Sequence, residues 1–256
     1  MLNREIKIFF AALTFFTRIP SPLSSDVHDE FLLNRAAKYF PLAGWIVGGL
    51  CALTLWISGH FFPNSVSIVL SMIAGILVTG AFHEDGFADT CDGFGGGWTR
   101  ERILDIMKDS RIGSYGAIGL VMILLAKYLL LGEILFHRLP FIIIAAHSLS
   151  RLVSTHCIFT HEYVGNLGGT KAKPLCSEIT WKEMLVASVF GVLPLFMLGS
   201  LWYLLAAVPV LISKWLLARY FKKWIGGYTG DCLGAIQQVG EIVFYMSVIF
   251  LKNNII

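Results

Sequence analysis

The sequence predicts an all-α fold: a polytopic membrane helical bundle of about seven transmembrane helices, preceded by an N-terminal interfacial helix. Hydrophobic residues make up 56% of the 256 positions and charged residues only 14%, against about 25% charged residues in soluble proteins. The apolar residues are gathered in segments of roughly the length that a bilayer requires. A soluble domain of this size could not hide so much apolar surface from water, and the same surface excludes intrinsic disorder. The net charge of +3 is too small and too scattered for nucleic-acid binding.

Residues 1–20 are expected to form the interfacial helix. The sequence Thr17-Arg18-Ile19-Pro20 that ends this segment offers no small-residue cleavage site, so a signal peptide is not predicted. Apolar residues recur there at helical spacing beside basic ones, as in helices that lie on a membrane surface; they are Ile6, Phe9, Phe10, Leu13 and Phe16.

Seven apolar segments follow, and together they cover residues 39–251 as a transmembrane bundle. The expected spans are Tyr39–Gly59, Val66–Phe82, Gly116–Phe136, Leu139–Phe159, Met184–Leu201, Tyr203–Ala218 and Leu233–Leu251. The fifth and sixth are short and contain Pro194 and Pro209, so their shared boundary is poorly defined. No repeat or hinge divides the chain, and we expect residues 1–256 to form a single integral-membrane domain.

The distribution of basic residues predicts the orientation of these spans. With the N-terminus inside, fifteen Lys and Arg residues fall on the cytoplasmic side, whereas only Arg138 and Lys252 fall on the other. The fifteen are Arg4, Lys7, Arg18, Arg35, Lys38, Arg100, Arg102, Lys108, Arg111, Lys171, Lys173, Lys182, Arg219, Lys222 and Lys223. Because cytoplasmic loops are enriched in Lys and Arg, we expect an integral membrane protein with its N-terminus in the cytoplasm.

An acidic segment, His83–Gly97, stands where basic residues would be expected. If it continues the second span as a helix, Asp85, Asp89 and Asp92 share one face at i, i+4 and i+7. Like charges at this spacing repel one another, and clustered oxygen ligands suit Mg²⁺ or another hard cation. Glu84 would point away from this face, toward solvent or toward a supporting position.

A second charged helix is expected after the glycine run. Arg102, Asp105 and Asp109 would share one of its faces at i, i+3 and i+7, with Asp105 in a supporting position. The two helices could present their carboxylates to one space. Arginines nearby can clamp phosphates with paired hydrogen bonds. Carboxylate-held metal ions beside arginines are typical of phosphoryl transfer.

Several motifs are similar to those of one enzyme family, cobalamin synthase (adenosylcobinamide-GDP ribazoletransferase). The resemblance extends over the whole chain and is strongest in HEDGFADTCDG, which begins at His83, and MKDSRIG, which begins at Met107. The other matching segments are FTRIP from Phe16, FPLAG from Phe40, Ser150-Arg151, and GGYTGDCLGA from Gly226.

The resemblance implies a reaction and its partners. It also implies that the single domain is catalytic and lies in the bacterial cytoplasmic (inner) membrane, with its active site in the cytoplasm. Such enzymes join adenosylcobinamide-GDP to α-ribazole or α-ribazole 5′-phosphate and release GMP, with Mg²⁺ as cofactor, in the last nucleotide-loop assembly steps of cobalamin biosynthesis. We accordingly expect Asp85, Asp89, Asp92 and Asp109 to be catalytic and to bind the metal. Either Asp89 or Asp92 would also accept the proton of the attacking hydroxyl group. The expected substrate-binding residues include Arg102, Lys108 and Arg111. Association with other corrinoid-assembly enzymes or a homo-oligomer is compatible with this activity.

Polar residues inside the spans extend the expected site. Lys127 and Arg151 are costly in lipid and should face the bundle interior, to bind substrate or to pair with a carboxylate such as Glu133. In the last span, Asp231 and Glu241 belong to a polar stripe on an otherwise apolar helix, and we expect both to bind substrate or metal. Thr229 or Asp231 would cap that helix. His147 and His156, in the span of Arg151, are expected to pack or to form hydrogen bonds and not to bind a metal.

Two other functions are compatible with parts of this pattern. Asp89-x-x-Asp92-Gly93 partly matches the CDP-alcohol phosphotransferases of phospholipid synthesis, but Gly96-Gly97 stands where their motif has Ala-Arg. A transporter would place its charges near the span centres and often contains inverted repeats. Here the acidic residues gather at one membrane edge, which favours the ribazoletransferase interpretation.

Overall fold

The computed structural model describes residues 2–20, 30–165 and 179–255. Within these ranges the chain forms helices and one isolated β-bridge, between Tyr163 and Tyr228, and no extended strand. The helices of the first half are α1 (Leu2–Phe16), α2 (Glu30–Ala36), η1 (Ala37–Tyr39), α3 (Phe40–Ser58), α4 (Asn64–Thr79), α5 (Phe82–Gly96), α6 (Arg100–Met107) and α7 (Ser114–Gly132). Those of the second half are α8 (Leu139–Thr160), α9 (Trp181–Val192), η2 (Leu193–Leu198), η3 (Leu201–Ala206), α10 (Ala207–Ile225) and α11 (Gly230–Asn254).

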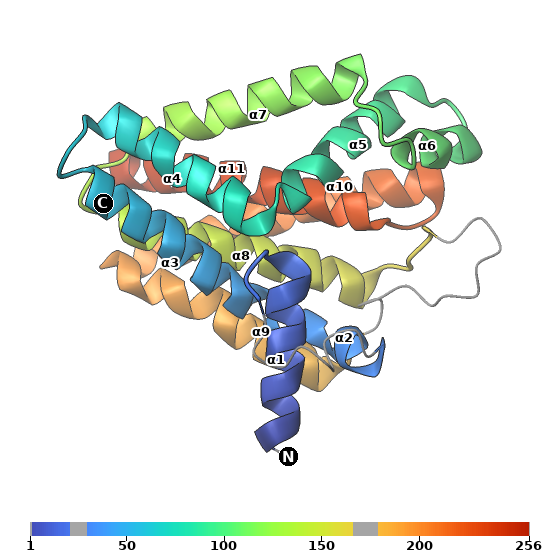
Figure 1. Ribbon diagram of the computed structural model, residues 1–256, viewed down its shortest axis with the longest axis horizontal. Coiled ribbons are helices and arrows are strands. Elements are labelled where there is room, and N and C mark those ends of the chain that lie inside the picture. Colours follow the sequence, from blue (N-terminus) through green and yellow to red (C-terminus); the bar gives the residue numbers. More distant parts are fainter. Residues whose placement is uncertain (1, 21–29, 166–178, 256) are drawn as a thin grey trace.

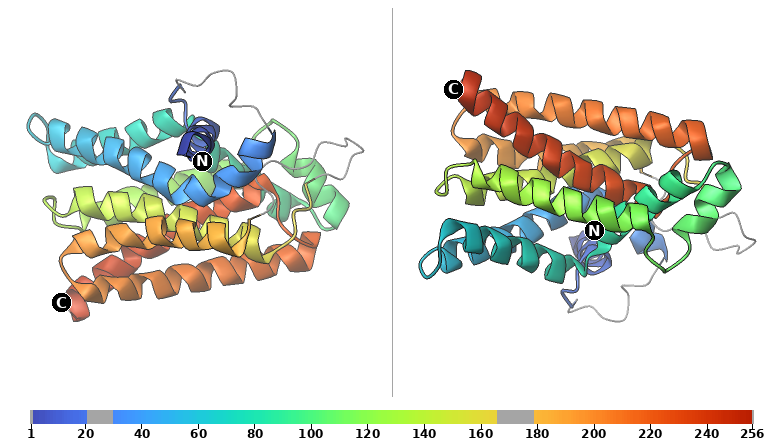
Figure 2. Two further views of the ribbon diagram at one scale, coloured as in Figure 1. Left: turned by 90° about the horizontal axis from the view of Figure 1, so that it is seen from below. Right: turned by 90° about the horizontal axis from the view of Figure 1, so that it is seen from above.

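The long helices lie side by side in one bundle, with α5 and α6 together at one end (Figure 1). The C-terminus lies at the opposite end in both further views (Figure 2). Six helical segments in the described ranges are long and apolar enough to cross a membrane, which confirms the predicted class of a polytopic helical bundle. They are Leu32–Ser58, Ser114–Gly132, Leu139–Thr160, Trp181–Leu198, Leu201–Ile225 and Gly230–Asn254.

Helices α4 and α5 would form a seventh span only as a pair, and they are bent by 87°. The acidic helix therefore does not continue the second span, which corrects that expectation. The break lies at Gly80 and Ala81, which both have left-handed backbone conformations (φ 66° and 60°). A side chain at Gly80 would also collide with Arg18. Helix α4 is the apolar member of this pair. Helix α5 carries four carboxylates, which are costly in lipid, so we expect α5 to lie outside the membrane-spanning segments.

The fifth and sixth spans meet close to the predicted boundary, at Gly199 and Ser200. Both are partly 3₁₀-helical there. Pro194 stands in the first turn of η2, where its missing N–H is no loss to the hydrogen-bonding pattern.

Helix α1 buries one face, as the amphipathic pattern predicts. Ile8 and Ala11 pack with Leu32 and Leu33 in a small apolar cluster. At its start, the Glu5 carboxylate lies 2.7 Å from Lys38 Nζ. These contacts confirm the helix, while its position at a membrane surface remains a prediction.

Glycines allow α3 and α8 to approach closely. A Cβ atom at Gly44 would lie 2.4 Å from the carbonyl oxygen of His147, and one at Gly48 would lie 2.8 Å from Ile144 Cα. Small residues four positions apart commonly let membrane helices pack backbone to backbone. This packing fixes the depth of His147 and Arg151 within the bundle.

Candidate active site

The acidic face of α5 lies against the start of α11. A Cβ atom at Gly86 would stand 2.9 Å from Asp231 Cα, so the two backbones nearly touch. Gly234 provides the reciprocal approach toward the carbonyl oxygen of His83. Thr229 caps α11 by accepting a hydrogen bond from the backbone N–H of Cys232, which confirms one of the two predicted caps. Asp231 is thereby brought to the acidic face of α5.

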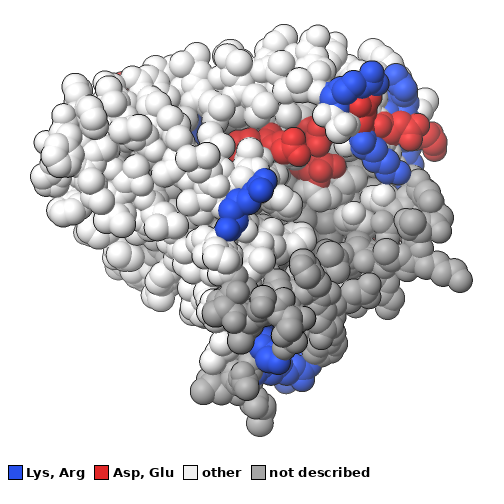
Figure 3. All heavy atoms as spheres, in the orientation of Figure 1, with Lys and Arg blue, Asp and Glu red and all other residues white. Residues whose placement is uncertain are grey.

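The carboxylates at this contact repel one another. Burial, together with the negative charges of Asp231, Asp85 and Asp92, raises the pKa of Asp89 to about 7. Figure 3 shows acidic side chains gathered over the region of α5, with basic and acidic side chains mixed over α6. On the side of the molecule that Figure 3 shows, the surface formed by α3, α4 and α7 is almost uncharged. A cation bound at this point would relieve the repulsion.

Asp92, the third carboxylate of the face, is already engaged. Its Oδ2 accepts a hydrogen bond from the Gly113 N–H (2.7 Å) and its Oδ1 accepts one from the Gly116 N–H (2.8 Å). These two donors belong to the first turn of α7 and the residue before it, where helical N–H groups have no intrahelical partner. Asp92 therefore anchors the start of α7 to α5.

A hollow of about 580 Å³ opens beside Asp92, between α5, α6 and the start of α7. The polar and charged side chains along it include those of Asp92, Arg102, Asp105, Asp109 and Arg111. Of the predicted α5 face only Asp92 lines this hollow, together with Asp105 and Asp109; Asp85 and Asp89 are not among its lining residues.

Asp109 lies beyond the end of α6 at Met107, so the predicted helical spacing does not extend to it. Its carboxylate instead accepts hydrogen bonds from the side chain of Arg111, which is 87% exposed. These bonds lower the pKa of Asp109 to about 2. Lys108, the C-cap residue of α6, is exposed. Arg111 borders the hollow, whereas Lys108 is not among its lining residues.

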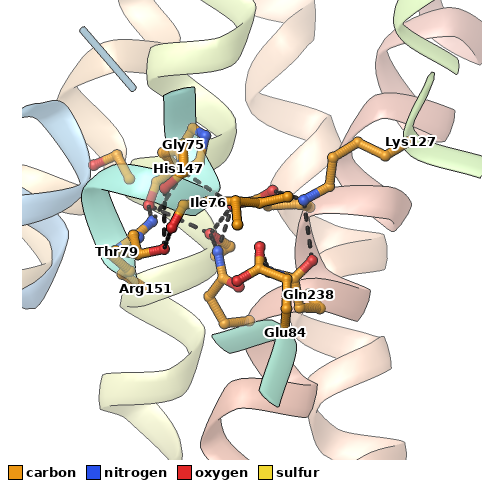
Figure 4. A network of polar contacts seen from close by, with 12 residues as sticks. Gly75, Ile76, Thr79, Glu84, Lys127, His147, Arg151 and Gln238 are labelled. Atoms are coloured by element: carbon orange, nitrogen blue, oxygen red, sulfur yellow. Dashed lines mark hydrogen bonds and ion pairs between the residues drawn. The ribbon is translucent and has the colours of Figure 1, made fainter. Parts of the chain in front are cut away.

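A buried polar network lies deeper in the bundle (Figure 4). Lys127 Nζ of α7 lies 2.8 Å from Glu241 Oε2 and donates a hydrogen bond to Gln238 Oε1 at 3.0 Å. His147 Nδ1 lies 3.1 Å from the other oxygen of Glu241. The interior positions predicted for Lys127 and Glu241 are confirmed, and the carboxylate that pairs with Lys127 is Glu241 and not Glu133.

Arg151 and Glu84 border the same network. The Arg151 side chain is almost fully buried, and its Nη1 bonds to the His147 carbonyl oxygen at 2.9 Å. Glu84 Oε1 accepts a hydrogen bond from Gln238 Nε2 at 2.9 Å. Of the two positions expected for Glu84, the solvated one is wrong, because the bend before α5 turns this side chain into the bundle, where it supports the polar network. The buried network also includes Gln237, Gln238 and His147. Residue types and spacing did not predict that these three side chains meet around Glu241.

The carboxylates at the α5–α11 contact are suitable ligands for Mg²⁺. Asp85, Asp89 and Asp231 offer carboxylate oxygens, the ligands that this hard cation prefers. Within the described ranges, no group of three His, Cys, Asp or Glu side chains is close enough to form a metal site alone. Mg²⁺ usually keeps several waters and binds through one or two carboxylates plus substrate phosphates, so an incomplete protein site agrees with an ion that substrate helps to hold.

Together these features define a polytopic membrane protein with clustered carboxylates, and a hollow bordered by arginines, at one end of its helical bundle. The chain belongs to the cobalamin-5-phosphate synthase family, whose profile matches residues 8–249. This membership agrees with the resemblance in the sequence motifs.

Individual relatives match over nearly the whole chain. The adenosylcobinamide-GDP ribazoletransferase of Shewanella amazonensis is 46% identical over 98% of both chains. The enzyme of the same name from Shewanella frigidimarina is 44% identical over 96% of this chain and 95% of its own. That of Shewanella oneidensis is 46% identical over 95% of this chain and 94% of its own. No solved structure matches the chain.

Proposed function

We propose that the chain transfers the phosphocobinamide group of adenosylcobinamide-GDP to the 3′-hydroxyl group of α-ribazole or α-ribazole 5′-phosphate. The ribazole oxygen forms a bond to the phosphorus borne by the cobinamide side chain, the pyrophosphate bond breaks, GMP leaves, and the hydroxyl proton goes to a base. The observation that carries this proposal is the convergence of Asp85, Asp89 and Asp231 on the α5–α11 contact, in a chain related to ribazoletransferases.

The carboxylates of this contact would hold Mg²⁺, which neutralises pyrophosphate charge when bound. Asp89 is the better of the two predicted bases. Both oxygens of Asp92 already accept backbone hydrogen bonds, whereas Asp89 lies beside Asp231 and Asp85 at the α5–α11 contact, where a proton acceptor is needed. Asp92 supports the site by holding α7 in place.

The adjoining hollow would receive the phosphates of the nucleotide. Arg102 and Arg111 border it and can each donate paired hydrogen bonds to phosphate oxygens. Asp109 holds Arg111 in its present orientation. Lys108 would add positive charge near the leaving GMP.

The test supplies adenosylcobinamide-GDP and either ribazole form to the purified protein in a bilayer, with Mg²⁺, and measures GMP and complete corrinoid. We expect both products from the native chain and a large loss of rate in Asp89→Asn. Glu101→Gln, the same carboxylate-to-amide change at an exposed position of α6, serves as the control and should retain the rate. Absence of both products from the native chain would refute the proposal.

We also propose that the acidic end of the bundle faces the cytoplasm, with the N-terminus on the same side. The support is the strong excess of Lys and Arg in the segments assigned to that side. Cysteine labelling with a membrane-impermeant reagent tests this: a cysteine introduced at exposed Glu101 should react only after the membrane is opened, and one at exposed Phe61 should react in intact cells.

A further inference from the structure

A cavity walled mainly by aromatic rings, the aromatic cavity, adjoins the α5–α11 contact. Its volume is about 270 Å³, near the lower end of the ~300–1,000 Å³ usual for small-molecule pockets. Its aromatic walls are Phe15 and Phe16 of α1, Phe40 of α3, Phe82 of α5, and Tyr163 and Tyr228. Five segments that are separate in the sequence therefore contribute rings to it.

Contacts between the rings give the aromatic cavity its shape. The ring centroids of Phe16 and Phe40 are 3.8 Å apart in an edge-to-face arrangement, and those of Tyr163 and Tyr228 are 5.6 Å apart. Backbone hydrogen bonds fix the tyrosine pair, because the N–H of Val164 donates to the Tyr228 carbonyl oxygen at 2.9 Å. The walls are thus positioned by the fold before any ligand enters.

One cationic side chain among the lining residues retains hydrogen-bonding capacity. Arg151 lines the aromatic cavity and is only 2% exposed. Its Nη1 bonds to His147, but Nε and Nη2 make no hydrogen bond with any residue that the structure describes. Both nitrogens are closed off from the open space of the cavity, and buried N–H groups without partners are costly. A ligand that brings an acceptor into the cavity would therefore favour a turn of the guanidinium toward it.

We propose that the aromatic cavity binds the base of the ribazole nucleoside, with Arg151 donating a hydrogen bond to its unsubstituted ring nitrogen. The identity of the nucleoside rests on the proposed function. The base of ribazole is a flat, dimethylated benzimidazole with one acceptor nitrogen and no N–H group. Rings stack on such a base, its methyl groups suit apolar walls, and its single acceptor matches the guanidinium donors.

The alternative aromatic ligand, the guanine of the other substrate, fits these walls less well. Guanine carries N–H donors as well as acceptors, and aromatic rings provide most of the lining. Donors left without acceptors in an apolar cavity would weaken binding. The walls therefore favour the base that has no donors.

The position of the aromatic cavity agrees with this assignment. Gly230 and Gly234 line it and stand on either side of Asp231 in α11, while His83 lines it from the start of α5. A base in the cavity would place its ribose close to the carboxylates proposed to receive the hydroxyl proton. The nucleophile and the acidic face would then meet at the α5–α11 contact.

The experiment measures direct binding of α-ribazole to the full chain in nanodiscs by calorimetry, without Mg²⁺ or the second substrate. Phe82→Ala removes one partly exposed ring that lines the cavity. It should weaken binding about tenfold, the usual order of effect for losing one stacked ring. Phe61→Ala, the same change at an exposed residue outside the cavity, should leave binding unchanged. Equal affinity in all three proteins would overturn the assignment.

A second arm tests Arg151 with an indole riboside, which has CH in place of the acceptor nitrogen. The native protein should prefer ribazole over this analogue by about tenfold or more, and Arg151→Met should abolish the preference. An unchanged preference in Arg151→Met, or tighter binding of guanosine than of ribazole, would contradict the proposal. Because binding is measured without turnover, a failure of the proposed reaction is distinguishable from a failure of the cavity assignment.

Discussion

Lys127 of α7 and Glu241 of α11 form an ion pair inside the helix bundle, with 2.8 Å between Nζ and Oε2. Glu241 is fully buried and also lies 3.1 Å from His147 Nδ1. Removing one partner of a buried pair leaves the other charge uncompensated, and this typically costs ~3–5 kcal/mol. The two substitutions should differ in cost, because Glu241 still has His147 as a neighbour when Lys127 is removed.

Glu241→Gln should therefore lower the melting temperature of the purified protein more than Lys127→Met does. The double variant should be more stable than the sum of the two losses implies, since neither charge is then left alone. Glu133→Gln makes the same chemical change at an exposed residue and should stay within ~0.5 kcal/mol of the native chain. A melting temperature for Glu241→Gln equal to that of Glu133→Gln would show that the pair does not stabilise the fold.

Asp92→Asn should loosen the start of α7. The amide retains one oxygen acceptor but turns its NH₂ group toward a backbone donor, so either Gly113 or Gly116 loses its partner. We expect a loss of ~1–3 kcal/mol in the free energy of unfolding and faster hydrogen exchange in the first turn of α7. Asp105→Asn, at an exposed carboxylate beside the same hollow, should leave that exchange unchanged. Unaltered exchange in Asp92→Asn would contradict the anchoring role.

Local periodicity made much of this arrangement predictable. Asp85 and Asp89 are four residues apart, so any helix through them puts both on one face, and α5 does so. The polar stripe that places Asp231 and Glu241 on α11 follows from the same rule. Apolar segment length predicted the bundle because a bilayer sets the length of a spanning helix.

Long-range contacts could not be predicted in this way. Lys127 and its partner Gln238 are separated by 111 positions, and no local pattern indicates which of two helices will face each other. The bend before α5 depends partly on Ala81, a residue type that rarely adopts a positive φ. That bend turns Glu84 inward, so a residue for which the sequence left solvent and a supporting position open joins the buried network.

Asp89→Asn should raise the melting temperature of the metal-free protein while it abolishes transfer. The substitution removes one charge from a group of carboxylates that repel one another. Mg²⁺ stabilises whatever folded protein it binds, so adding the ion should raise the melting temperature of the native chain and have little effect on Asp89→Asn. Glu101→Gln should respond as the native chain does. Equal stabilisation of all three proteins by Mg²⁺ would place the ion away from Asp89.

Gly86→Ala should separate α5 from α11 and thereby disrupt the acidic site. The new methyl group would stand 2.9 Å from the backbone of Asp231, and backbone atoms cannot move aside as the end of a flexible side chain can. We expect a loss of transfer activity together with a lower melting temperature. The control is Gly49→Ala in α3, where no atom lies within 4 Å of the added carbon and alanine favours the helix by about 1 kcal/mol. The opposite signs of the two stability changes would show that close helix contact, and not helix propensity, requires glycine at position 86. If Gly86→Ala kept full activity, the approach of α5 to Asp231 would be unnecessary for the reaction.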